Sequence, residues 1–204
     1  STNGIYLTGN NRINTVMNCN ITDFTNGIYI YNSSNNTVIK NNLTGNMYGI
    51  ILQYYSSNNT IANNTAYKNT NGIVLMALSS NNKNNNLIDN VVFENTDSGI
   101  GFGTTSENNT VRGGSIMNNY KDYYTSGTTE NYFINTNFTE SRKIGFYTDP
   151  SWFNYNNETT GNIWLKTNVP ATGLSVTITR KLTNWSQPLI QWNDTSSLSK
   201  IATY

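Results

Sequence analysis

The sequence predicts an all-β protein, a right-handed parallel β-helix, and three observations support this prediction. A unit of about 23 residues recurs along the chain. Within each unit, short apolar patches alternate with polar residues at a period of two, which is typical of strands. The chain also contains 40 Asn among its 204 residues, and stacked strands accommodate ladders of Asn side chains. No apolar pattern with a period of 3.6 residues indicates helices.

The repeat is clearest at a Gly-Ile pair and at a later Asn-Thr-Val block. The glycines of the first motif recur at Gly4, Gly27, Gly49, Gly72 and Gly99. The second motif, or a close variant, begins at Asn14, Asn36, Asn59, Asn85, Asn109 and Asn131. A fainter sixth copy of the first motif covers residues 122–124, and a seventh begins at Ile144.

One unit is too short for a strand–helix–strand crossover. It is long enough for three short strands and three turns, which is one coil of a β-helix. We therefore expect about six to seven coils, stacked so that equivalent residues lie above one another. Three apolar columns should then face inward. The first strand supplies Ile5, Ile28, Ile50, Ile73 and Ile100 with the residues two positions later; the second supplies Val16, Val38, Ile61, Leu87 and Val111; the third supplies Ile21, Leu43, Ala66, Val92, Ile116 and Phe138.

Two further columns have structural interpretations. The glycines should mark a bend with positive φ, or a place where no Cβ fits. Another column contains Cys19, Asn41, Asn64, Asn90, Gly114 and Thr136. We expect it to form a buried ladder of amides, in which Cys19 is a buried thiol and not a reactive one. The fourth unit is longer, and its additional residues within 76–84 predict a protruding loop.

The pattern fades after residue 148, which suggests a β-helix over residues 1–148 and a second unit over 149–204. Alternating stretches at 162–166, 174–180, 189–192 and 200–204 predict a small antiparallel segment, either a cap on the rod or a truncated β-sandwich. Ser1 lies inside a repeat unit, which we interpret as the start of a mature form or of a fragment.

The composition excludes several kinds of partner. The net charge is +1 and 11% of the residues are charged, so electrostatic binding to nucleic acid is not expected. No apolar run is long enough to span a membrane. The chain has no His and only one Cys, which removes the commonest general base and the commonest metal ligand. We expect no cofactor and no metal site.

The Gly-Ile-x-Leu and Asn-Asn-Thr-Val units resemble the repeats of NosD-like parallel β-helices, a group that overlaps with the carbohydrate-binding and sugar hydrolase β-helices. The resemblance covers residues 1–148. Asn-rich versions resemble surface proteins of methanogenic archaea, and residues 162–186 are similar to segments that follow such β-helices. The resemblance implies a fold more than a function, because the group includes lyases, hydrolases, epimerases and inert stalks.

Two sets of residues are candidates for a site. β-Helix hydrolases place paired carboxylates on an outer face, and the richest acidic cluster here is Asp89, Glu94, Asp97 and Asp122, with Glu107 nearby. Because these acids fall mostly in turns, we favour solvated turn residues over catalytic acids. The second set consists of tyrosines expected on or beside the outer face of the first strand, which could contact sugar rings or lie under the C-terminal segment. These are Tyr6, Tyr29, Tyr31, Tyr54 and Tyr55.

The Asn-x-Ser/Thr motifs are candidate N-glycosylation sites and favour an extracellular or cell-surface location. The alternative is that Asn-Asn-Thr is the turn chemistry of the repeat itself. The motifs begin at Asn20, Asn32, Asn35, Asn42, Asn58, Asn63, Asn108, Asn137, Asn157, Asn184 and Asn193.

Taken together, these observations favour a non-catalytic structural or adhesin-like module that contacts carbohydrate or neighbouring surface proteins. Two alternatives are a polysaccharide hydrolase or lyase, and a self-assembling subunit of a surface layer or filament. Sugar release that depends on Glu94 or Asp97 would indicate the enzyme, and concentration-dependent light scattering would indicate self-assembly.

Overall fold

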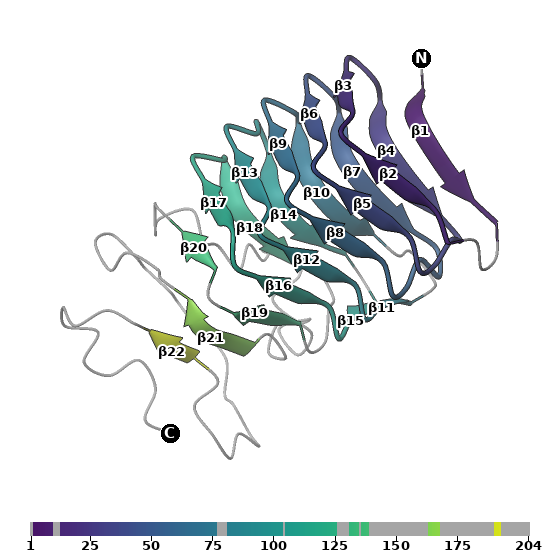
Figure 1. The fold of residues 1–204 in the computed structure, drawn as a ribbon. Helices are drawn as coiled ribbons and strands as arrows, with labels where there is room; N and C mark the ends of the chain where they lie inside the picture. The colour runs from purple at the N-terminus through teal and green to yellow at the C-terminus, as the bar shows by residue number, and fades with distance from the viewer. Residues whose placement is uncertain are drawn as a thin grey trace, which may run out of the picture.

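A computed structural model of the chain describes residues 2–9, 13–76, 81–103, 105–125, 131–134, 136–138, 163–167 and 190–192. Every regular element in these residues is a β-strand. The strands form a parallel β-helix in which each coil lies against the next (Figure 1). Among the residues described, no helix is long and apolar enough to cross a membrane.

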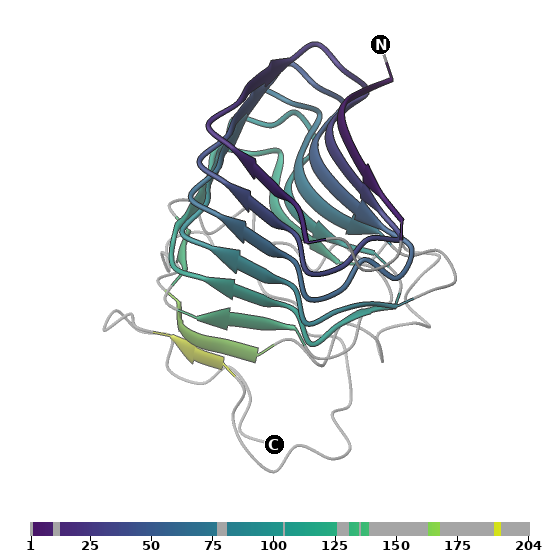
Figure 2. The same cartoon turned by 45° about the vertical axis from the view of Figure 1, so that its right-hand side comes forward.

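Three sheets run along the rod, and most coils contribute one strand to each sheet (Figure 2). The first sheet contains β1 (Asn3–Thr8), β4 (Asn26–Tyr31), β7 (Tyr48–Gln53), β10 (Asn71–Met76), β14 (Ser98–Phe102) and β18 (Lys121–Thr125). The second contains β2 (Thr15–Met17), β5 (Thr37–Ile39), β8 (Thr60–Ala62), β12 (Asn86–Ile88), β16 (Thr110–Arg112), β19 (Tyr132–Ile134), β21 (Ile163–Thr167) and β22 (Ile190–Trp192).

The third sheet contains β3 (Asn20–Thr22), β6 (Asn42–Thr44), β9 (Thr65–Tyr67), β13 (Val91–Phe93), β17 (Ser115–Met117) and β20 (Asn137–Phe138). A short fourth sheet pairs β11 (Asn82–Lys83) with β15 (Ser106–Glu107). It lies at the corner between the first and second sheets, where the coils differ most in length.

The core follows the predicted register. Ile28 is paired with Ile50, and Ile50 is paired with Ile73. The second sheet aligns Val38 with Ile61, and the third aligns Leu43 with Ala66. These side chains are fully buried and belong to one continuous cluster. Because a single coil buries only a few apolar side chains, this cluster exists only when the coils are stacked.

The glycine column is explained by close packing and not by a positive φ. A Cβ on Gly72 would lie 2.5 Å from both the carbonyl oxygen of Gly99 and Cγ1 of Val92. Gly27 and Gly49 meet the backbone of the next coil in the same way. The glycines therefore allow neighbouring coils to approach each other where the chain enters the first sheet.

Most corners of the described coils combine a left-handed residue with a buried Asn that follows it. Lys40, with φ of 56°, precedes Asn41, and Asn63, with φ of 53°, precedes Asn64. The left-handed residue turns the chain, while the Asn after it points inward. These left-handed residues are Asn35, Asn58, Asn84 and Asn108 at the first corner; Asn18, Lys40, Asn63, Asp89 and Gly113 at the second; and Asp23, Gly45, Lys68, Glu94 and Asn118 at the third. Positive φ values also occur at Gly9, Asn32, Tyr54, Tyr55, Thr105 and Gly114.

The predicted Asn ladder is confirmed at its centre. Oδ1 of Asn64 accepts hydrogen bonds from the backbone N and Nδ2 of Asn41, at 2.9 and 3.0 Å. Nδ2 of Asn64 donates to the carbonyl of Val38 and to Oδ1 of Asn90, at 2.9 and 3.1 Å. At the first coil, the backbone N of Cys19 donates to Asn41. Each buried amide thus joins its own coil to the next.

Two more ladders with the same geometry were not predicted. Their shared feature is an Asn that follows a left-handed residue at the other two corners. One ladder contains Asn14, Asn36, Asn59, Asn85, Asn109 and Asn131. The other contains Asn46, Asn69, Asn95 and Asn119, and it ends on Asp122.

The coil count and the C-terminal segment differ from expectation. The six strands of the first sheet enclose five turns, slightly fewer than the six to seven coils expected, and the copy at Ile144 lies outside the described residues.

Strands β21 and β22 overlap two of the four stretches expected to be antiparallel, but each pairs in parallel with its neighbour. The other two stretches lie outside the described residues, so the antiparallel segment is unconfirmed. The domain boundary at residue 148 stays a prediction.

Part of the segment expected to form a loop within residues 76–84 is a strand instead, and residues 77–80 lie outside the described residues. Met76 ends β10, and Asn82 is a buried residue of β11. Oδ1 of Asn82 accepts from the backbone N of Ser56, and its Nδ2 donates to the carbonyl of Leu52, both at 3.0 Å. Asn82 therefore belongs to the internal polar network and does not protrude.

We predict that Gly72→Ala lowers the free energy of unfolding by about 2 kcal/mol or more, because its Cβ would overlap backbone and core atoms. Gly101→Ala is the matched control in the same sheet, since its nearest atom would lie at an ordinary 3.5 Å. We expect the control to change stability by no more than about 0.5 kcal/mol. Urea unfolding of both variants measures the difference. Similar losses in both would contradict the packing explanation.

Candidate functional site

Four tyrosines gather on the outer side of the first sheet. Tyr6 on β1 is aligned with Tyr29 on β4, and Tyr31 ends the same strand. Tyr54 follows β7 directly. We call Tyr6, Tyr29, Tyr31 and Tyr54 the tyrosine face. All four were predicted candidates, and the alignment of coils brings them together across about 50 residues of sequence.

The rings of the tyrosine face form a continuous series of contacts. Tyr6 and Tyr29 are stacked, with centroids 5.1 Å apart and planes inclined by 21°. Tyr29 meets Tyr31 edge-on at 5.7 Å, and Tyr31 meets Tyr54 at 4.8 Å with a tilt of 56°. Such contacts hold each ring in place and leave part of its surface accessible. Tyr6 retains 47% of its surface exposed, and the other three are half-buried.

Gln53 completes the face and was missed by the sequence analysis. The hydroxyl of Tyr29 donates to Oε1 of Gln53 at 2.7 Å. Nε2 of Gln53 contacts Sδ of Met76 at 3.7 Å. Gln53 aligns with Tyr31 in the sheet register. Its place in the same outward column as Tyr31 was the feature of the sequence that could have identified it. The amide fixes the orientation of the central phenol.

The environment of Tyr29 keeps its phenol protonated. Burial, together with the neighbouring hydroxyls of Tyr6, Tyr31 and Tyr54, raises the pKa of Tyr29 from 10.0 to about 12. Burial is the largest of these causes, because it disfavours the phenolate more than the neutral phenol. The face is therefore uncharged at Tyr29 over the physiological range.

The corner after β7 holds its tyrosines in a conformation that bulky residues rarely adopt. Tyr54 and Tyr55 both have positive φ, at 49° and 45°. Such residues cost of order 1–3 kcal/mol each and concentrate at functional sites. The hydroxyl of Ser56 donates to the carbonyl of Gln53 at 2.7 Å, and Ser34 Oγ donates to the carbonyl of Tyr55 at 3.1 Å. These serine bonds stabilise the turn.

Tyr55, the fifth tyrosine predicted, is 62% exposed at this corner. No ring contact joins it to the tyrosine face within the described part of the chain. Further along the outward column, Ile51 and Val74 are only 2% and 5% exposed. The accessible aromatic surface therefore covers the β1–β4–β7 part of the first sheet and does not extend along the whole rod.

The candidate catalytic acids are each placed in a structural arrangement. Glu94 lies 3.8 Å from Nζ of Lys68, and Asp97 lies 3.0 Å from Nζ of Lys121. Asp122 is buried and accepts from the backbone N and Nδ2 of Asn119 at 2.9 and 2.8 Å. Asp89 is an exposed left-handed corner residue. Two of these acids have lysine partners, one is buried, and one is an exposed corner residue. Such positions favour structural roles for these acids over a catalytic pair.

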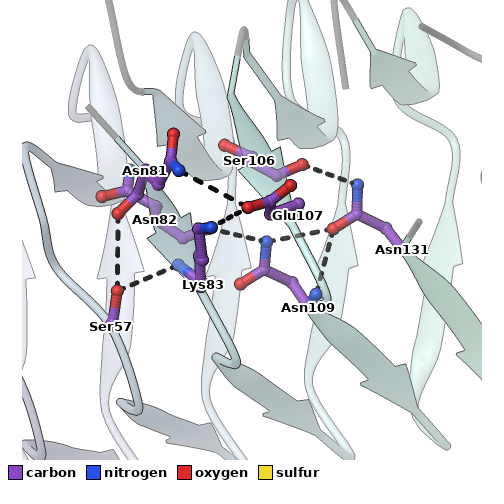
Figure 3. A network of polar contacts seen from close by, with 8 residues as sticks. All are labelled: Ser57, Asn81, Asn82, Lys83, Ser106, Glu107, Asn109 and Asn131. Carbon is purple, nitrogen blue, oxygen red and sulfur yellow. Dashed lines mark hydrogen bonds and ion pairs between the residues drawn. The ribbon is translucent and has the colours of Figure 1, made fainter. Parts of the chain in front are cut away.

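Glu107, the remaining acid, belongs to a polar network at the corner that contains β11 and β15 (Figure 3). It forms an ion pair with Lys83 and accepts from Nδ2 of Asn81 at 3.4 Å. The backbone N of Lys83 donates to Oγ of Ser57 at 3.0 Å. These contacts connect three successive coils and pair the two charges of this corner with each other.

The corner geometry accounts for many of the predicted glycosylation motifs. Asn35, Asn58, Asn63 and Asn108 are exposed left-handed residues, each followed by a ladder position and then by a Thr at the start of a strand. Glycan attachment stays a prediction for all eleven motifs. Asn20 and Asn42 begin strands, Asn32 follows Tyr31, only the backbone of Asn137 is described, and Asn157, Asn184 and Asn193 lie outside the described residues.

Comparisons with known proteins agree with this architecture. A family model described as "Periplasmic copper-binding protein (NosD)" matches residues 1–193. The chain belongs to the NosD family. The resemblance inferred from the repeat motifs is therefore confirmed. No finding bears on the resemblance to archaeal surface proteins, which stays a prediction. No curated protein matches the chain in sequence.

Among solved structures, this NosD-family chain is similar to the crystal structure of the periplasmic alginate epimerase AlgG. The TM-score is 0.56 at 21% identity, over 68% of this chain and 33% of the epimerase chain. A double mutant of AlgG gives a TM-score of 0.53 at 18% identity, over 72% of this chain and 37% of the other. The chain thus spans about a third of these structures, and the likeness establishes the fold alone.

The family description mentions copper, but the described residues of this chain do not assemble a copper site. Protein copper sites use His, Cys and Met ligands. The sequence has no His and a single Cys. Within the described part of the chain, no three residues from His, Cys, Asp and Glu gather closely enough to hold a metal. The thiol of Cys19 instead contacts the carbonyl of Met17 at 3.3 Å.

We therefore predict that the chain does not bind copper stoichiometrically. Titration with Cu(I) and Cu(II) at roughly micromolar concentrations should give no saturable binding, because no ligand set is assembled. The variant Cys19→Ser controls for simple thiol binding. One equivalent of copper retained by this variant would contradict the prediction.

The raised pKa of Tyr29 gives a prediction about alkaline pH. Absorbance at about 295 nm follows phenolate formation, and Tyr29→Phe should remove a titration step near pH 12. Because the folded pKa exceeds the unfolded value, stability from Tyr29 is present below pH 10 and is lost between about 10 and 12. Circular dichroism checks that the rod is folded. An unchanged absorbance titration around pH 12 in Tyr29→Phe would contradict the assigned environment.

Proposed function

We propose that this chain is a non-catalytic, extracytoplasmic β-helix module that contacts carbohydrate through the tyrosine face. The observation that carries the proposal is the contact series from Tyr6 through Tyr29 and Tyr31 to Tyr54. Aromatic faces bind the apolar C–H surface of a sugar ring, while phenol hydroxyls and amides reach its hydroxyl groups. A flat sheet of stacked strands presents such groups in a fixed arrangement.

Preorganisation favours binding at this face. The four rings restrain one another, Gln53 fixes the hydroxyl of Tyr29, and the serines of the following corner fix the turn at Tyr54. A face that is ordered before binding loses less conformational entropy when a ligand arrives. The strained backbone at Tyr54 and Tyr55 is consistent with a position maintained for contact with a ligand.

Location is inferred from the family and the fold relatives. The matching family is described as periplasmic, and so is the alginate epimerase AlgG. An extracellular or cell-surface location is the more specific part of the proposal, and the many glycosylation motifs support it. The adhesin-like role, self-association and any activity of the whole protein also belong to the proposal, because this chain spans only part of its fold relatives.

The absence of catalysis is supported by the placement of the acids. Glu94 and Asp97 have lysine partners, and Asp122 contributes to the end of a ladder. A retaining or inverting pair would need two carboxylates on opposite sides of one bound sugar. The likeness to AlgG at 21% identity indicates its fold and does not transfer its activity.

The central test is the loss of polysaccharide binding in Tyr31→Ala, because Tyr31 contacts both Tyr29 and Tyr54. We expect affinity for a bound soluble polysaccharide to fall about tenfold, which corresponds to about 1.4 kcal/mol. Affinity electrophoresis in gels containing each polysaccharide measures the change. Tyr67→Ala is the matched control, since Tyr67 is stacked on Phe93 at 5.1 Å on the third sheet.

Three outcomes would contradict the proposal. Binding that is equally reduced in Tyr31→Ala and Tyr67→Ala would assign the contact to another surface or to general destabilisation. If the chain bound none of the polysaccharides tested, the proposed carbohydrate-binding function would be contradicted. Sugar release that disappears in Glu94→Gln or Asp97→Asn would establish the polysaccharide-active enzyme instead. Light scattering at two protein concentrations tests self-association in the same samples.

A further inference from the structure

We infer that the tyrosine face selects uncharged sugars and rejects acidic polysaccharides. This inference rests on the proposed function and specifies the ligand class of the same site. It separates this chain from its fold relative AlgG, which is named as an epimerase of alginate, an acidic polysaccharide.

The strands that form the face carry no charged residue. The sequences of β1, β4 and β7 are NGIYLT, NGIYIY and YGIILQ. The corner residues 32–34 and 54–57 are Asn, Ser and Tyr only. A carboxylate brought to this surface would lose hydration without meeting a cation from these segments, which is costly.

The two charged groups at the next corner of the described rod are paired with each other. Lys83, at the next corner, forms an ion pair with Glu107, and Glu107 also accepts from Asn81 (Figure 3). A polyanion would have to separate this pair to use the lysine. The corner therefore provides no net positive charge from Lys83 and Glu107 to attract an acidic chain.

The aromatic surface itself disfavours anions. The face of a tyrosine ring carries the negative end of the ring quadrupole, so it attracts C–H groups and cations and repels carboxylates. Tyr6 and Tyr29 are stacked with ring centroids 5.1 Å apart, so one face of each ring is turned toward the other ring. A ligand that covers a ring face left exposed must present an apolar, uncharged surface.

The polar groups of the face also suit a neutral ligand. Oε1 of Gln53 accepts from Tyr29, while Nε2 of Gln53 carries two hydrogens and contacts only the weak acceptor Met76 Sδ among the described residues. One amide N–H can therefore donate to a sugar hydroxyl. Neutral donors and acceptors of this kind match hydroxyl groups and do not compensate a full negative charge.

The experiment compares one neutral and one acidic polysaccharide on the full 204-residue chain. The probes are hydroxyethyl cellulose and alginate, each in affinity gels and in solution titrations at low and high NaCl. The variants are Tyr31→Ala, Tyr67→Ala and Arg12→Gln. Arg12 lies outside the described residues, between β1 and β2, so it is the cation to remove from this part of the sequence.

We expect hydroxyethyl cellulose to bind at least tenfold more tightly than alginate. Its affinity should change less than about twofold with salt, because no ion pair is involved. Tyr31→Ala should weaken it about tenfold, while Tyr67→Ala and Arg12→Gln should leave it unchanged.

Equal or tighter binding of alginate, lost in Tyr31→Ala, would overturn the inference and leave the proposed function standing. Alginate binding that falls with salt and disappears in Arg12→Gln would also overturn it, by showing charge recognition beside the face. If neither polysaccharide binds, or if binding is insensitive to Tyr31→Ala, the inference fails together with the proposed function.

Discussion

The structure depends on hydrogen bonds between coils that lie in register. The strands of the second and third sheets are at most three residues long between β2 and β20, so few ladder bonds hold each one. The buried Asn amides add side-chain bonds along the same axis, to the amide of the next coil and to a backbone carbonyl. A buried amide without partners is costly. Any shift of register would leave several unpaired at once.

The direction of the ladders explains a residue that was first considered for catalysis. Each Asn accepts through Oδ1 on one side and donates through Nδ2 on the other, so a residue inside a ladder needs both functions. The last position only has to accept from the Asn before it. Asp122 occupies this position and accepts both bonds of Asn119. The carboxylate is thus explained by its place in the ladder.

Sequence periodicity was sufficient to predict the inward columns, because stacking aligns identical positions of the repeat. It also predicted the ladder through Asn41, Asn64 and Asn90. It did not predict the ladder through Asn46 and Asn69, which lies three positions after the third inward column, because the many exposed Asn residues hide that column. Single-sequence periodicity also cannot separate Asn82, which is buried, from exposed neighbours such as Asn84. The need for glycine at position 72 could be recognised only from the position of the next coil, whose backbone a Cβ would meet.

The tyrosine positions of the candidate site followed from the same register, but their interactions did not. Gln53 lies in register on β7, but its bond to Tyr29 and the positive φ of Tyr54 and Tyr55 are not specified by the repeat pattern. The outer residues are also free to vary, since the core and ladders do not require them. A family named for copper can therefore include a chain with no His and a single Cys, and a fold shared with an alginate epimerase can present a neutral aromatic face.

The most direct test of the account compares Asn64→Asp with Asn63→Asp. The first change keeps the shape of the side chain but replaces both donated bonds, to Val38 and Asn90, with contacts between oxygen atoms. The second alters an exposed left-handed corner residue next to it, where Asp is tolerated. Urea unfolding should show a loss of about 3 kcal/mol or more for Asn64→Asp and at most about 0.5 kcal/mol for Asn63→Asp. Equal stability of the two variants would contradict the central role of the buried ladders.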